Sequence, residues 1–299
     1  MTNKARTIET TDPQTPDDLN FLLQRYDQAG QRRDGWQNLW QEAYNYTLPN
    51  RGNFTQHHTA GRLATDQIYD ATAMDAVDQL AASILGNLTP PWSQWFGLKP
   101  GPDLSPEESE AVAPVLEKAG KTLQDHFDRS NFSVEIHQSF LDLIIGGTAS
   151  LYFDEAGLGE FSAFQFTSVP LSQIVLEESP DGLLNGTFRE SDMTRDQIID
   201  RFPDAQIPEN IESIADKAPQ TGFSVLEAVL PDIGGYNFTA LLNDNSSNPY
   251  TLTRQRLQFN PFINFRWVKT PEEIYGRSPI MKALPDIKTD RKSTRLNSS

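Results

Sequence analysis

Carboxylates are the side chains in this sequence that could most readily form a reactive site. Asp192, Asp196 and Asp200 recur every four residues, a spacing that places three carboxylates on one face of a helix. Such a face could hold a divalent cation for a hydrolase or a nuclease. However, Arg195 and Arg201 lie among these acids, and with 41 acidic residues in the chain, neighbouring carboxylates are expected by chance. We therefore interpret this helix as a solvated surface.

Other residue types that support catalysis or metal binding are scarce. The chain contains no Cys, which excludes a thiol nucleophile, a thiolate metal site and a disulfide framework. The four His are His57 and His58 in a polar loop, and His126 and His137 on predicted helices. Signatures of phosphate-binding loops, dinucleotide-binding folds, serine hydrolases and zinc proteases are absent. We predict no catalytic residue, no metal ligand and no cofactor.

Proline and aromatic residues are concentrated in the stretch TPPWSQWFGL, which contains Pro90, Pro91, Trp92, Trp95 and Phe96. An exposed Pro-Pro-Trp segment could dock a partner protein. Alternatively, the prolines make a rigid turn that directs the aromatic rings into the core. We favour the second interpretation for Trp95 and Phe96.

The net charge of −16 is distributed unevenly along the chain. Residues 101–235 contain 25 acids and 7 bases, a net charge of −18, whereas residues 236–299 contain 5 acids and 10 bases, a net charge of +5. An acidic middle region would repel nucleic acid. It is either an ordinary solvated surface or a surface that a polyanion passes without binding, and composition does not distinguish the two.

Hydrophobic spacing predicts helices in the first half of the chain. We expect residues 1–18 to be a disordered polar tail without a secretion signal, and no apolar run reaches the length of a membrane span. One helix should then end at Pro49, and a second should end with a C-cap at Gly86.

Two further helices have clear boundary signals. Ser105 and Glu108 form a capping box at the start of the third helix, and Pro114 should kink or restart that helix. The fourth should end at the pair 146–147, where two glycines follow an apolar segment.

After residue 147 the hydrophobic period changes from that of a helix to that of a strand. Residues 148–166 and 173–191 are typical of two hairpins, and four more strand-like segments lie between residues 223 and 268. Thr194 should cap a short helix, and residues 207–217 are expected to form another. Helices followed by a mixed or antiparallel β-rich region predict an α+β fold.

Six blocks of the sequence, taken in order, resemble one family of proteins. They are WQNLWQEAYNYTLPNR, IYDATAMDAVDQLAASILGNLTPPWSQWFGL, GTASLYFDE, FTSVPLSQIVLEESPDG, FRESDMTRDQIIDRFP and EIYGRSPIMKALPDIKT. They are similar to the head-to-tail connector, or portal, proteins of short-tailed bacteriophages. The resemblance spans about residues 19–289.

The resemblance implies a structural component of a virion and no enzymatic activity. Portal proteins form a dodecameric ring at one capsid vertex, are assembled in the host cytoplasm, and bind terminase, scaffold, capsid and tail proteins. Double-stranded DNA passes through their channel during packaging and ejection, without sequence specificity. No membrane partner is implied. An acidic metal-dependent hydrolase or nuclease with an unrecognised carboxylate site is the alternative, and a generic binding module is a third hypothesis.

The resemblance also implies a domain division. Residues 19–289 would form a wing-like domain, helical over 19–147 and β-rich over 148–270, with the start of a stem helix over 279–289. Tyr275, Gly276, Arg277, Ser278 and Pro279 would lead the chain into that helix. Here Gly276 allows a sharp turn, Ser278 caps the helix and Pro279 occupies its first position.

The sequence departs from the family after Thr289, because residues 290–299 are polar and basic and lack an apolar stripe. We expect them to be a foreign-looking tail without a defined conformation, joined to the N-terminal part of a portal. We also expect the chain to occur as a monomer or as heterogeneous small oligomers.

Overall fold

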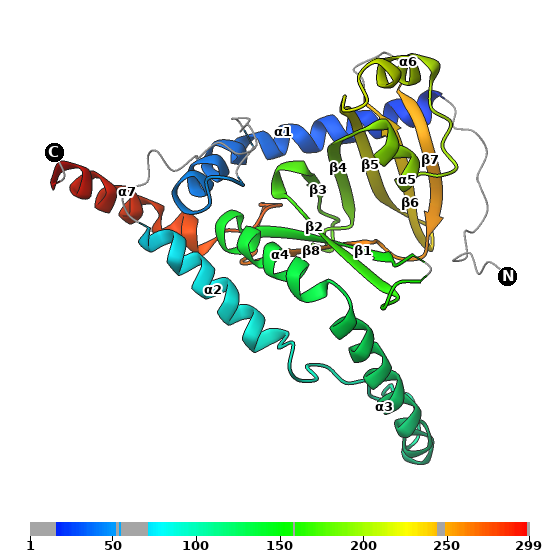
Figure 1. The fold of residues 1–299 in the computed structure, drawn as a ribbon. Coiled ribbons are helices and arrows are strands. Elements are labelled where there is room, and N and C mark those ends of the chain that lie inside the picture. The colour runs from blue at the N-terminus through cyan, green and yellow to red at the C-terminus, as the bar shows by residue number, and fades with distance from the viewer. Residues whose placement is uncertain (1–15, 52–53, 55–70, 158, 244–248, 298–299) are drawn as a thin grey trace. The chain divides into compact units, whose positions relative to one another are not determined.

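The computed structural model describes residues 16–51, 54, 71–157, 159–243 and 249–297 (Figure 1). The chain has helices in its first half and antiparallel strands in its second, so the predicted α+β fold is confirmed. It divides into two compact units, which are described separately. Within the described ranges, no helix is both long and apolar enough to cross a membrane.

The first unit comprises residues up to 38, 172–260 and 271–275. Its five-stranded antiparallel sheet has the order β3-β4-β5-β6-β7. The strands are β3 (Ile174–Glu177), β4 (Gly186–Met193), β5 (Phe223–Asp232), β6 (Gly235–Leu242) and β7 (Tyr250–Leu257). Two short helices, α5 (Arg195–Arg201) and α6 (Glu209–Lys217), connect β4 to β5.

Helix α1 (Pro16–Thr47) begins in the first unit and continues into the second. Its first part covers one face of the five-stranded sheet (Figure 1). There Leu22 and Ala29 pack in one core cluster with Phe188, Leu226 and Leu241 from three strands. The amphipathic spacing of α1 therefore gives the sheet its apolar cover.

The second unit comprises residues 39–171, 261–270 and 276 onward. Its sheet has three antiparallel strands in the order β2-β1-β8: β1 (Thr148–Glu155), β2 (Phe164–Val169) and β8 (Phe262–Arg266). Its helices are α2 (Thr72–Leu88), α3 (Pro106–Arg129), α4 (Phe132–Gly146) and α7 (Pro279–Asn297). Helix α4 packs against β1 and β2, and α2 and α7 pack against α4 (Figure 1).

Most predicted boundaries are confirmed. The capping boxes of Ser105 with Glu108 and of Thr194 with Gln197 are both formed. Gly86 is not a C-cap, because α2 continues to Leu88.

Pro114 lies within one α-helix and does not divide α3 into two. A proline inside a helix loses one hydrogen bond and clashes with the carbonyl four residues earlier, yet the turns on both sides of Pro114 remain helical.

Helix α7 is longer than expected. It continues to Asn297, so the expectation that the chain beyond Thr289 lacks a defined conformation is wrong for the backbone of residues 290–297. Once the first turns of a helix are anchored, adding residues is much less costly than nucleation, and an apolar stripe is not needed for it.

Candidate functional site

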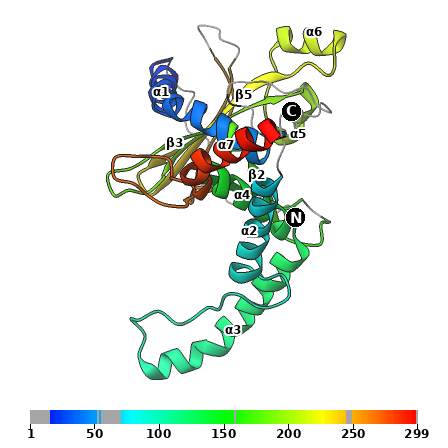
Figure 2. The same ribbon diagram turned by 90° about the vertical axis from the view of Figure 1, so that its left-hand side faces the viewer.

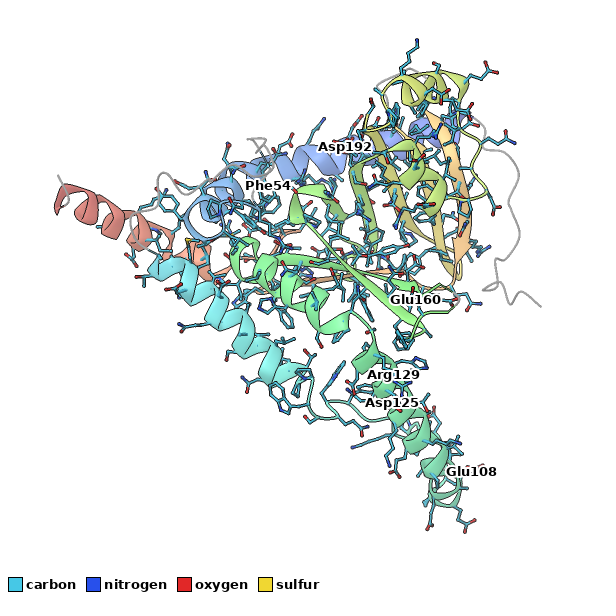
Figure 3. The ribbon with its side chains drawn as sticks, in the orientation of Figure 1. Phe54, Glu108, Asp125, Arg129, Glu160 and Asp192 are labelled. Atoms are coloured by element: carbon cyan, nitrogen blue, oxygen red, sulfur yellow. The ribbon has the colours of Figure 1, made fainter. Side chains whose placement is uncertain are left out.

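The three spaced aspartates do not form a site on one helix. Asp192, labelled in Figure 3, belongs to strand β4. Asp196 and Asp200 lie on α5. All three side chains are exposed, and Asp196 is paired with Arg195 at 3.1 Å. The helical spacing was misleading because Thr194 begins α5 only after Asp192.

The two described histidines, His126 and His137, belong to no metal-binding group of side chains. His57 and His58 lie outside the described residues. The imidazole Nδ1 of His126 accepts a hydrogen bond from the Ala163 amide at 3.2 Å, and the ring packs against Phe164. His137 is half-buried on α4. The described part of the chain contains no group of three or more His, Cys, Asp or Glu side chains that could hold a metal ion.

The junction where α4 ends and α7 begins, in the second unit, is tightly constrained. Gly147 follows α4 with φ +76°, in the left-handed region that favours glycine. A Cβ at Gly147 would lie 2.2 Å from the Gly276 carbonyl oxygen, and a Cβ at Gly276 would lie 2.2 Å from the Gly147 oxygen. The two backbones therefore touch, and only glycine fits on either side.

Side-chain hydroxyls complete this junction. The Gly276 amide donates a hydrogen bond to the Thr148 hydroxyl at 2.8 Å. The buried Ser278 hydroxyl donates to the Ile145 carbonyl at 2.8 Å and accepts from the Met281 amide at 2.9 Å. Ser278 thus caps α7, as predicted, and also bonds the end of α4. Gly276 does not have a positive φ. Glycine is required at this position because a Cβ would clash with the Gly147 carbonyl.

The neighbouring Tyr275 belongs to the first unit. Its side chain is 1% exposed, its hydroxyl accepts a hydrogen bond from the Leu176 amide at 3.1 Å, and its ring packs against Trp36. Burial raises the pKa of Tyr275 from 10.0 to about 12. Tyr275 and Ser278 therefore anchor the YGRSP segment in two different units. Arg277 is exposed, and Pro279 is the first residue of α7.

The proline and aromatic block is divided between surface and core. Trp92 is 76% exposed and Pro91 is exposed, whereas Pro90 is half-buried. Trp95 and Phe96 are half-buried. The ring of Trp95 stacks on Phe132 at 5.8 Å and meets Phe127 edge-on at 5.5 Å. The packing of Trp95 agrees with the interpretation that the prolines make a rigid turn and direct the aromatic rings toward the core. The Trp95 ring is half-buried, however, and not fully buried.

Comparison with known proteins identifies the family. A model described as bacteriophage head to tail connecting protein matches residues 20–297. The chain belongs to this family of connector proteins. A curated relative, named a probable portal protein, of Bordetella phage BPP-1 is 26% identical over 282 residues, which cover 90% of this chain. The connector chain covers 50% of the length of that relative.

The connector also contains buried ionic groups that sequence inspection did not single out. In the first unit, the Glu227 carboxylate is 0% exposed and lies between Arg201, at 2.6 Å, and Arg189, at 3.4 Å. These residues come from β5, α5 and β4. No local signal distinguishes Glu227 from the other 40 acids, because its partners come from a neighbouring strand and from a helix.

A second buried group lies in the second unit of the connector. The Asp142 carboxylate accepts hydrogen bonds from the Tyr44 hydroxyl at 2.6 Å and from Arg51 at 2.7 Å. Burial raises the pKa of Asp142 above its ordinary value, while Arg51 acts in the opposite direction. The Trp40 indole donates to the Gly146 carbonyl at 3.0 Å. These bonds attach the end of α1 to α4, directly before the glycine junction.

Proposed function

We propose that this connector chain acts as a portal subunit, a structural component of a phage virion. In this proposal copies of it contribute to a dodecameric ring at one capsid vertex, through which double-stranded DNA is packaged and ejected. The observation that carries the proposal is the family match over residues 20–297. Terminase, scaffold, capsid and tail proteins would be its partners, and assembly would take place in the host cytoplasm.

The glycine junction supports a mechanical role. Helix α7 begins at a point where two backbones touch and where Ser278 bonds both helices. A contact between backbones leaves no flexible side chains to deform, so the direction of α7 relative to α4 is held firmly. Such an anchor suits a part that must keep its shape while DNA moves past it.

The portal function can be tested in the phage that encodes this chain. A nonsense mutation in the gene should yield heads without packaged DNA and without tails when the host is infected. Supplying the intact gene in trans should restore filled, tailed particles, as seen by electron microscopy and by nuclease-resistant DNA. Filled particles that lack the chain altogether would refute the proposal.

The proposal also holds that the connector is not an enzyme. The purified chain, incubated with duplex DNA and Mg²⁺ or Mn²⁺, should show no hydrolysis above buffer. A metal-dependent turnover that is abolished by changing Asp192, Asp196 and Asp200 to Asn would favour the nuclease alternative instead.

A further inference from the structure

Helix α1 carries the chain from the first unit into the second without a break, and the boundary lies between residues 38 and 39. The helix is well packed on both sides of this boundary, since Ala29 is 1% exposed in the first unit and Trp40 is 0% exposed in the second. Residues 30–39 between them are all described, and none of them is buried. The helix is therefore held firmly on either side and more loosely in the middle.

Two glycines weaken this middle stretch. Gly30 and Gly35 both lie inside the helix, and a Cβ at either position would meet nothing within 4 Å in the described structure. Close packing therefore does not require glycine there, in contrast to Gly147 and Gly276. Glycine in a helix interior is less favourable than alanine, because it loses more conformational freedom on folding. The tendency to be helical is thus low where the packing of α1 is weakest.

Other crossings of the chain between the units lie beside the same stretch. The chain also crosses just before Ser172 and just after Tyr275. Arg33 donates a hydrogen bond to the Ser172 carbonyl at 2.5 Å, and the ring centroids of Trp36 and Tyr275 are 6.1 Å apart. Three of the five crossings therefore come together at this part of α1. A bend there would displace these crossings little, which is the geometry that a hinge needs.

The remaining two crossings follow Asn260 and Thr270 and lie in irregular segments. Of the described helices and strands, only α1 and the one-turn helix Leu171–Gln173 continue across a boundary between the units. Irregular segments can absorb changes in φ and ψ, whereas an α-helix stays nearly straight unless a defect weakens it. The stiffness of α1 therefore controls whether the two units can change their mutual orientation.

We propose that residues 30–35 of α1 form a hinge, at which the helix bends and lets the two units take more than one mutual orientation. Gly30 and Gly35 provide the conformational freedom, while the contacts of Arg33 and Trp36 keep the pivot beside the other crossings. Helices α4 and α7 both belong to the second unit, so this motion leaves the glycine junction intact. The inference goes beyond the portal proposal, which requires no motion of these units.

Changing glycines tests the hinge in the full chain. Gly30→Ala with Gly35→Ala stiffens the helix, whereas Gln31→Gly loosens it at an exposed position without a change of charge. Gly97→Ala with Gly101→Ala is the matched control, because a Cβ at either position also meets nothing within 4 Å and neither residue lies in α1. Thermal melts establish that each variant is folded.

Amide hydrogen exchange reports the stability of the helix itself. Peptides that cover residues 30–39 should exchange about tenfold more slowly in the stiffened variant than in the unchanged chain. The same peptides should exchange faster in Gln31→Gly and at an unchanged rate in the control. Exchange of α4, which lies outside the hinge, should be the same in all four proteins.

Distances between spin labels report the motion of the units. The chain contains no Cys, so introduced cysteines are the only sites that react with the label. Exposed Glu212 on α6 marks the first unit, and exposed Gln79 marks the second on α2, which lies along α4 (Figure 2). Glu212 with exposed Gln255 is the control pair within the first unit. Pulsed electron paramagnetic resonance measures each distance distribution, with labelled chain diluted into unlabelled chain so that only distances within one molecule are seen.

The pair that spans the two units should give a broad distribution in the unchanged chain, a narrower one in the stiffened variant and the broadest in Gln31→Gly. The pair within the first unit should stay narrow throughout. Two outcomes would overturn the hinge: a spanning distribution in the unchanged chain as narrow as that of the control pair, or a broad one that ignores the α1 substitutions. Exchange of residues 30–39 that ignores the substitutions would also reject it.

Discussion

At the residue scale, the two facing glycines of the α4–α7 junction give the sharpest prediction. Gly147→Ala places a Cβ against the Gly276 carbonyl and forces a strained φ of +76°. Strain and overpacking should together lower the free energy of unfolding by at least about 2 kcal/mol. Gly101→Ala is the matched control, since a Cβ there meets nothing within 4 Å. Urea unfolding measures both, and equal stabilities of the two variants would contradict the close approach.

Tyr275 gives a prediction about pH. The folded pKa of about 12 lies above the value of 10.0 for an unburied phenol. The folded state therefore keeps a proton that the unfolded chain loses first. The resulting stability is complete below about pH 10 and is lost as the pH rises toward the folded pKa, by about 3 kcal/mol in total.

Comparison with Tyr275→Phe isolates this loss. The variant should be about 1 kcal/mol less stable at neutral pH, because the Leu176 amide loses its acceptor. Above about pH 10 its free energy of unfolding should fall less steeply than that of the unchanged chain. Parallel curves, measured by urea unfolding at each pH where both proteins are folded, would show that the phenol is not buried.

At the element scale, the exposed first half of α3 and the buried helix α4 should differ in local stability. Amides of the exposed half should exchange hydrogen quickly in dilute solution, whereas those of the buried helix α4 should exchange slowly. Pro114→Ala restores a donor and removes a steric clash worth about 3 kcal/mol, so exchange in the exposed half should slow at least about tenfold. The exchange of α4 should not change. Mass spectrometry of peptides from the two helices checks this, and equal protection of both would contradict the exposure of the first half of α3.

At the scale of the whole molecule, the first unit is made of segments that are distant in sequence. Residues 172–260 alone should not fold cooperatively, because Phe188, Leu226 and Leu241 would lose their cover by α1. Joining residues 16–38 to this segment by a flexible linker should restore a cooperative urea transition, measured by circular dichroism. Leu22→Asp with Ala29→Asp in the joined chain should abolish the transition again, since each places a charge in the apolar core. A cooperative transition of residues 172–260 alone would mean that α1 is dispensable.

The sequence by itself determined the elements whose signals are local. Capping boxes at Ser105 and Thr194 and the left-handed Gly147 each depend on residues within one or two turns, so their positions were predicted correctly. The order of helices and alternating strands likewise indicated the α+β class. The blocks that resemble portal proteins were sufficient to identify the family.

Only the tertiary structure decided which distant residues meet. Strand β8 pairs with β1 across more than a hundred residues, and that pairing is what brings Gly276 against Gly147. Glu227 is buried only because β4 and α5 supply Arg189 and Arg201. Asp192 was placed on a helix because its spacing to Asp196 fits one, yet pairing with β5 holds it in a strand. Local patterns carry no information about such partners, since burial and pairing arise from contacts between segments far apart in the chain.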